Sequence, residues 1–256
     1  MAAQPERYKR LQYNNLMITK WLGFLLIVVG VGIGHSLSVV MTWAETEANL
    51  RVSSTNSKPL EMSCPWMMSY TETGTIMVQI VNETSLEVES IVSAAFGQPN
   101  TSKQELTYQK YILAPKERLS VQWQVDSSNA AFGRIIPVIV KQSSYKINPR
   151  RVNACGIVLF NLFNWNGSTT LTFIIGVSIL CLAAGLFLTR ISPVPQFDAI
   201  KNMSQLRTML CILTLAVIAS SLLRWWGASI ILEAISAITL GSILTDLLIP
   251  SNGLTR

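Results

Sequence analysis

Leu119-Ser120-Val121-Gln122-Trp123-Gln124-Val125 is the clearest run of alternating apolar and polar residues in the chain. Alternation with a period of two predicts a β-strand with one face in a hydrophobic core and the other in water. Ala114-Pro115-Lys116-Glu117 has the composition of a turn, and Leu106–Leu113 before it predicts another strand. We therefore expect this part of the chain to form a β-domain.

Further short strands are predicted on both sides of this pair. They are expected at Thr75–Val81, Leu86–Val92, Arg134–Lys141 and Cys155–Phe160. Because no convincing helix interrupts residues 60–166, these strands favour an antiparallel β-sandwich over a parallel α/β fold.

The succession of strand, Leu113–Glu117 turn and strand within residues 112–125 resembles immunoglobulin-like and fibronectin-like modules. The resemblance covers less than half of the chain. It implies an all-β immunoglobulin-like or fibronectin-like sandwich, a kind of domain that usually presents binding surfaces.

Two of the four cysteines, Cys64 and Cys155, lie near the two ends of the β-domain. In a domain outside the cytoplasm this placement favours a disulfide between them. Cys181 and Cys211 lie inside apolar runs and are expected to be free and buried.

The chain is 50% hydrophobic and only 13% charged, against roughly 25% charged in an average soluble protein. Crossing a bilayer as a helix takes about 20 apolar residues. Four helices of suitable composition are predicted at residues 21–42, 169–189, 208–223 and 228–249. The last two could instead be one crossing and one interfacial helix. We expect the sandwich to be inserted between helices 1 and 2, with residues 43–59 as a polar stalk.

The basic residues responsible for the net charge of +6 gather in residues 1–20 and 190–207, beside apolar spans. This is the distribution of the positive-inside rule, and it argues against a nucleic-acid partner. It predicts a multi-pass protein of the plasma (cytoplasmic) membrane. The N-terminal segment, the 190–207 loop and the 250–256 tail would then be cytoplasmic, and the β-domain would lie outside.

His35 and Glu233 are ionisable residues inside predicted spans. Counted from the outer helix ends they lie roughly 10 Å and 8 Å deep at the helical rise. Such residues usually face a partner or a cavity. They could meet as an intramembrane polar pair, or share a polar layer with serines at positions 36, 38, 220 and 221. In the alternative, Glu233 pairs with Arg224 and His35 bonds to helix backbone.

Gly30, Gly34 and Ser38 recur at four-residue spacing on the first span and are expected to form a helix-packing face. The same small residues could leave room for a haem or a chlorophyll-type pigment ligated by His35. We expect no cofactor as the main interpretation, because a single histidine offers no second ligand of its kind.

No pattern in the chain predicts a metal cluster, a phosphate-binding loop or a nucleophile beside a base. We therefore expect a non-enzymatic structural or accessory subunit of a membrane protein complex. Its partners would be the lipid bilayer, other integral membrane subunits and an extracytoplasmic protein ligand. Two alternatives stay open. One is a transport or channel component using His35 and Glu233. The other is a cofactor-bearing subunit of an electron-transfer or light-harvesting complex.

Overall fold

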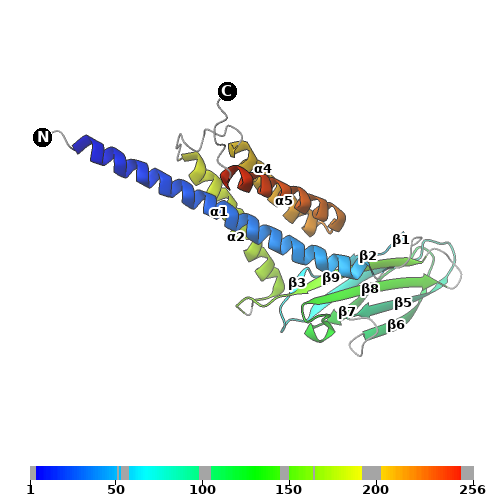
Figure 1. The fold of residues 1–256 in the computed structure, drawn as a ribbon. Helices are drawn as coiled ribbons and strands as arrows, with labels where there is room; N and C mark the ends of the chain where they lie inside the picture. The colour runs from blue at the N-terminus through cyan, green and yellow to red at the C-terminus, as the bar shows by residue number, and fades with distance from the viewer. Residues whose placement is uncertain are drawn as a thin grey trace, which may run out of the picture. The chain divides into compact units, whose positions relative to one another are not determined.

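The structure is a computed structural model that describes residues 4–50, 52, 58–97, 105–144, 150–163, 165–191 and 203–248. The chain divides into two compact units. The sheet unit is Val40–Thr172, and the helical unit combines Met1–Val39 with Phe173–Arg256. Figure 1 shows the helices and strands of both units.

The described elements are four α-helices, one short 3₁₀-helix and nine strands. The helices are α1 (Gln4–Asn49), α2 (Gly167–Ile191), α4 (Met203–Leu222) and α5 (Trp226–Leu248), with η1 at Ser127–Asn129. The strands are β1 (Lys58–Pro59), β2 (Glu61–Ser63), β3 (Met67–Met68), β4 (Gly74–Val81), β5 (Val88–Phe96), β6 (Glu105–Leu113), β7 (Arg118–Val125), β8 (Ile135–Ser144) and β9 (Arg151–Leu159).

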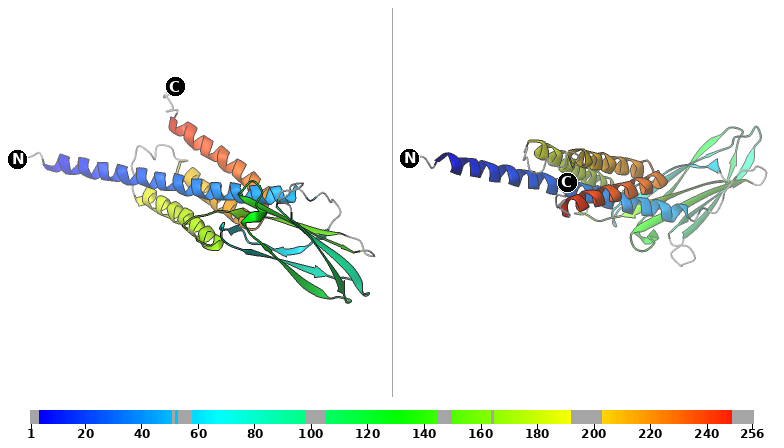
Figure 2. Two further views of the ribbon diagram at one scale, coloured as in Figure 1. Left: turned by 90° about the horizontal axis from the view of Figure 1, so that it is seen from below. Right: turned by 45° about the horizontal axis from the view of Figure 1, so that its top comes forward.

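Two sheets make up the sheet unit (Figure 2). The larger sheet has the order β1-β9-β8-β5-β6, with β3 also paired to β9, and the smaller has the order β2-β4-β7. Strands β5, β6, β8 and β9 pair antiparallel, whereas β1 and β3 run parallel to β9. The larger sheet is therefore mixed.

Both sheets contribute to one hydrophobic core. The predicted strand at residues 119–125 is β7, and its Val121, Trp123 and Val125 are buried while Gln122 and Gln124 are exposed. Strand β4 pairs with β7 in register and buries the same face through Ile76, Val78 and Ile80. The other side of the core comes from β5, β8 and β9. Alternation in the sequence thus corresponds directly to the core face.

The predicted fold class, four transmembrane helices with an all-β immunoglobulin-like sandwich inserted between helices 1 and 2, was wrong. The structure has four helices and mixed sheets, and the N-terminal helix precedes the sheets as one continuous element. That helix continues to Asn49, and its part from Val40 onward belongs to the sheet unit. Residues 43–49 are therefore helix and not stalk. Their alanines and glutamates favour a helix, although their polarity suggested a linker.

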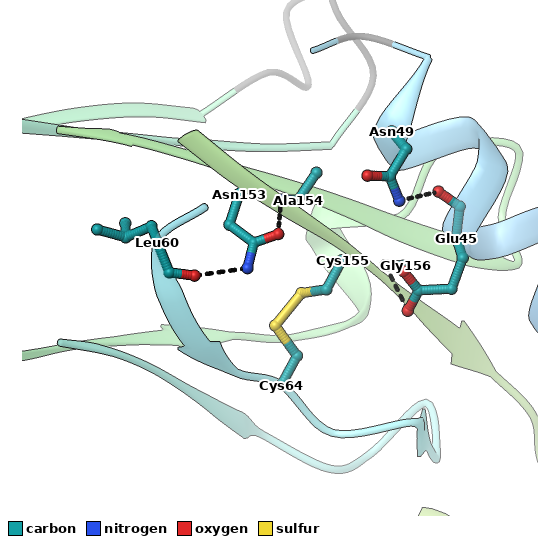
Figure 3. Close-up of a disulfide and its surroundings, with 8 residues drawn as sticks. All are labelled: Glu45, Asn49, Leu60, Cys64, Asn153, Ala154, Cys155 and Gly156. Carbon is teal, nitrogen blue, oxygen red and sulfur yellow. Dashed lines mark hydrogen bonds between the residues drawn. A yellow bond between two sulfur atoms is a disulfide. The ribbon is translucent and has the colours of Figure 1, made fainter. Parts of the chain in front are cut away.

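The end of α1 packs against β9 at a glycine (Figure 3). A Cβ added to Gly156 would fall on the carbonyl group of Ala44. Ala44, Glu45 and Ala48 are almost fully buried, and the Gly156 amide lies 3.4 Å from a carboxylate oxygen of Glu45 in hydrogen-bond geometry. The helix can approach the strand this closely because residue 156 has no side chain.

The start of α2 is also held within the sheet unit. The amide of Gly167 donates to the Glu72 carboxylate at 2.8 Å, and the same carboxylate accepts from the amide of Ser69 at 3.0 Å. A carboxylate at a helix N-terminus satisfies an orphan N–H group and interacts favourably with the helix dipole.

Asn82 joins three chain segments at one end of the sheets. Its side chain is only 4% exposed. Its side-chain nitrogen lies 2.8, 3.1 and 2.9 Å from the carbonyl oxygens of Leu86, Leu113 and Ala114, so its two protons are shared among three acceptors. Its carbonyl oxygen accepts from the amide and the hydroxyl of Thr84. Asn82 thus fixes the end of β4 to the turn between β6 and β7.

Three helical segments are long and apolar enough to cross a membrane: Met17–Asn49, Gly167–Ile191 and Gln205–Leu222. They are compatible with a membrane protein. Within the described residues, the fourth predicted span is a shorter apolar helix, Trp226–Ser242. The prediction of four transmembrane helices is thus corrected to three candidates.

Candidate functional site

Three serine hydroxyls from three helices meet inside the helical unit. Ser38 of α1 lies 2.5 Å from Ser221 of α4 and 3.0 Å from Ser229 of α5, and the last two are 2.9 Å apart. All three residues are buried. We call them the serine cluster.

The serine cluster has fewer protons than polar contacts. The hydroxyl of Ser221 also lies 3.0 Å from the Val217 carbonyl, in a geometry that lets it donate. Three hydroxyls carry three protons, and these oxygens make four contacts, so the four cannot all be hydrogen bonds at one instant.

His35 and Glu233 extend this polar layer along two of the helices. His35 precedes Ser38 by three residues on α1, and Glu233 follows Ser229 by four on α5, so each lies on the same face as its serine. Nε2 of His35 and Oε1 of Glu233 are both buried without a hydrogen-bond partner in the described part of the chain. Each such unpaired polar atom costs free energy in an apolar bundle.

The other serines named from the sequence lie elsewhere in the helices. Ser220 is buried and donates to the Val217 carbonyl at 2.9 Å, and Ser36 is exposed. Ser229, which the sequence argument did not single out, completes the cluster instead. Its position three residues into α5, on the same face as Glu233, is the signal that could have identified it.

Gly30 and Gly34 pack α1 against its neighbours within the helical unit. A Cβ at Gly30 would lie 2.9 Å from Cγ of Leu182 on α2, and a Cβ at Gly34 would lie 2.8 Å from Cγ2 of Thr214 on α4. The hydroxyl of Ser178 donates to the Gly30 carbonyl at 2.8 Å. Small residues here allow helices to approach each other closely.

This packing bears on the haem or pigment hypothesis at His35. The hypothesis needed open space beside Gly30 and Gly34, and side chains of α2 and α4 fill that space. The described residues around the stripe therefore do not fit a macrocycle. No group of three or more metal-ligating side chains is found within the described residues either.

The structure contains a disulfide between Cys64 and Cys155, whose Cα atoms are 6.7 Å apart (Figure 3). It connects the segment after β2, in the smaller sheet, to β9 in the larger sheet. Asn153 on the same strand donates to the Leu60 carbonyl at 2.6 Å. Cys181 and Cys211 are free and buried. The disulfide therefore closes the core across both sheets.

A cluster of charged side chains at the start of β9 was not predicted from the sequence. The carboxylate of Glu83 lies 2.5 Å from the Arg151 guanidinium and 3.4 Å from the Lys58 ammonium. The hydrogen bond from Arg151, the charge of Arg151 and then that of Lys58 hold the pKa of Glu83 below its ordinary value. Lys58 and Glu83 are largely exposed, so these ion pairs contribute little to stability.

Strand β6 exposes large apolar side chains on the outer face of the larger sheet. Leu106, Tyr108 and Ile112 are 52%, 68% and 67% exposed. Lys110 lies among them and pairs with Glu89 of β5 at 2.9 Å. Alternation within Leu106–Leu113 predicted the strand, but it could not show that this face has no covering element among the residues described. We call Leu106, Tyr108, Lys110 and Ile112 the β6 stripe.

No protein-family model matches this chain, and no curated protein does. Solved structures share limited parts of it. A β-glucosidase from Listeria innocua in complex with glucose is 17% identical over 43% of this chain, with a TM-score of 0.31. A cycloisomaltooligosaccharide glucanotransferase from Paenibacillus sp. is 12% identical over 43%, with a TM-score of 0.32. This chain spans only 17% and 15% of those two proteins.

A CARDB domain from Pyrococcus furiosus, in complex with di-metal ions, is 11% identical over 42% of this chain and is covered over 97% of its own length, with a TM-score of 0.30. At this level of similarity none of the three assigns a fold or a function.

Proposed function

We propose that this protein is a non-enzymatic structural or accessory subunit of a membrane protein complex, and that its sheet unit is the assembly module. The observation that carries the proposal is the β6 stripe, in which three of the four side chains are apolar and strongly exposed. Exposed apolar groups clustered on one face are typical of protein interaction surfaces. Partners would include other integral membrane subunits or an extracytoplasmic protein ligand, beside the bilayer itself.

We also propose that the sheet unit lies outside the cytoplasm of a plasma-membrane protein whose termini are both inside. A disulfide persists in an oxidising compartment, which supports placing Cys64 and Cys155 there. The basic residues of segments 1–20 and 190–207 favour the cytoplasmic side for those segments.

Photo-crosslinking in native membranes tests the accessory role. A benzophenone amino acid replaces Tyr108 in one variant and Gln122 in the other. Gln122 is an exposed residue of β7, on the outer face of the other sheet. We expect Tyr108→benzoylphenylalanine to give discrete protein adducts by immunoblotting and mass spectrometry, because its ring would lie in the interface. The Gln122 variant should give none. Absence of adducts from position 108 would contradict the proposed assembly surface.

A second candidate function is transport, with His35 and Glu233 on a polar path. The observation that favours it is a buried polar atom without a hydrogen-bond partner among the described residues on each of these two side chains, on the helix faces that carry the serine cluster. Intramembrane ionisable residues often mark ion or proton pathways. Three or four helices would form such a path only as part of a larger assembly.

The His35–Glu233 pair gives a prediction that separates transport from packing. We expect Glu233→Gln to abolish pH-driven flux in proteoliposomes if the path exists, because glutamine cannot exchange a proton. Thermal stability in detergent should change by less than about 1 kcal/mol, since glutamine keeps the shape of glutamate. His35→Ala and the double variant complete a mutant cycle, and Ser242→Ala, at an exposed position of α5, serves as the control. No measurable flux in the unaltered protein would eliminate transport.

A further inference from the structure

Strand β6 ends the larger sheet. Among the described strands it has a neighbour only on its β5 side, as the sheet order shows (Figure 1). It is nine residues long, contains no proline, and pairs with β5 residue by residue without a bulge. Natural proteins usually shorten, bulge or charge an edge strand to prevent pairing. Strand β6 carries two charged residues, Glu105 at its first position and Lys110, and Lys110 is paired with Glu89 of β5.

We propose that β6 pairs antiparallel with β6 of a second copy of this chain, with the two-fold axis at Gln109. The inference rests on the proposed function, because it names the partner of the β6 stripe. Two copies joined in this way extend one sheet across the pair. The interface is isologous, so each contact occurs twice.

The residue pattern of β6 selects this register. With the axis at Gln109, Leu106 lies opposite Ile112 of the partner subunit, and Tyr108 lies opposite Lys110 of the partner subunit. Both are favourable cross-strand pairs, one apolar and one between a cation and an aromatic ring. The β6 stripe is therefore complementary to a second, antiparallel copy of itself.

Other pairing registers of the two β6 strands give less favourable cross-strand pairs. With the axis at Lys110, two ammonium groups face each other, and like charges directly opposite are destabilising. With the axis at Tyr108, Leu106 faces Lys110 of the partner subunit. If one β6 strand were shifted along the other by one residue, the two β6 stripes would lie on opposite faces of the joined sheet, because side chains alternate along a strand.

The pairing would reduce the exposure of the β6 stripe in part. Leu106, Tyr108 and Ile112 are each more than half exposed, and a neighbouring strand would cover the sides of these side chains while their tips remain on the outer face. The ion pair between Lys110 and Glu89, at 2.9 Å, holds the lysine along the strand. In the paired sheet, the lysine and the apolar side chains of the two β6 stripes would form one continuous surface.

Cysteine crosslinking in native membranes tests both the pairing and its register. Cys181 and Cys211 are first replaced by alanine, which leaves only the Cys64–Cys155 disulfide. Gln109→Cys then places two thiols at the axis, and oxidation is expected to convert at least half of the chain to a covalent dimer. Gln122→Cys, on β7, is the matched control and should stay monomeric.

A second arm uses two differently tagged chains, one carrying Leu106→Cys and the other Ile112→Cys. Co-expressed, they should crosslink to each other. Expressed alone, each should give little dimer, because like positions lie far apart in this register. Resistance of the sheet unit to limited proteolysis, at the level of the unaltered protein, shows in every variant that the sheet unit is folded.

The outcomes distinguish the inference from the proposed function. Dimers in both arms support self-pairing at this register, and a Gln109→Cys dimer without the mixed product overturns the register. A folded, monomeric Gln109→Cys chain whose position 108 still photo-crosslinks to a different protein overturns self-pairing and leaves the accessory role standing. If a folded chain gives no cysteine-linked dimer and no photo-crosslinked adduct, both the self-pairing of β6 and the accessory role are overturned.

Discussion

Replacing Gly156 by alanine is expected to lower the midpoint of thermal unfolding by about 10 °C, which corresponds to roughly 3 kcal/mol in a domain of this size. The added Cβ would coincide with the main-chain carbonyl of Ala44. Unlike a flexible side chain, a helix backbone cannot move aside alone. Either the whole end of α1 withdraws from β9 or the strand bends.

Thermal unfolding of the full-length protein in mild detergent measures this effect. Gly227→Ala is the matched control, because an added Cβ there meets nothing within 4 Å. It should leave the midpoint within about 2 °C, as expected for substitutions away from packed sites. If Gly156→Ala behaves like this control, the close approach of α1 and β9 is wrong.

Removing the disulfide should have a still larger effect. Cys64 and Cys155 are separated by 91 residues, and in the chain-entropy model a loop of that length contributes roughly 4 to 5 kcal/mol. Single domains are stable by only about 5 to 15 kcal/mol. Cys64→Ala combined with Cys155→Ala is therefore expected to leave a substantial unfolded fraction at 37 °C.

Urea unfolding of the sheet unit, followed by proteolysis of the full-length protein in detergent, measures this loss. Cys181→Ala combined with Cys211→Ala removes the same number of sulfur atoms from the helices and is the control. Its effect should be limited to modest cavity costs. An unchanged midpoint in the variant lacking Cys64 and Cys155 would mean that the crosslink adds nothing to the folded domain.

Much of the sheet unit was predictable because its signal is local. Alternation at residues 119–125 identified both the strand β7 and its buried face. The parallel pairs with β9 were not predictable, since β1 and β3 are two residues long and pair with a strand some ninety positions away. Strands this short have no period for a pattern to reveal.

The end of α1 and the polar layer in the helices could not be predicted from neighbouring residues alone. Residues 43–49 looked like a stalk because their burial depends on Gly156, more than a hundred residues later. Depth counting predicted that His35 and Glu233 lie at one level, and each lies on the same helix face as a member of the serine cluster. Depth counting could not show which serines meet, because the rotation of each helix about its axis is set by packing against neighbouring helices.

The environment of Asn82 also affects how the protein would be processed in a secretory pathway. Asn82-Glu83-Thr84 has the acceptor sequence for N-linked glycans. The nitrogen that would receive the sugar is committed to three backbone carbonyls and is buried. A folded chain therefore offers no acceptor at this position. A glycan on Asn82 would mark a molecule that was modified before β4 and β6 came together.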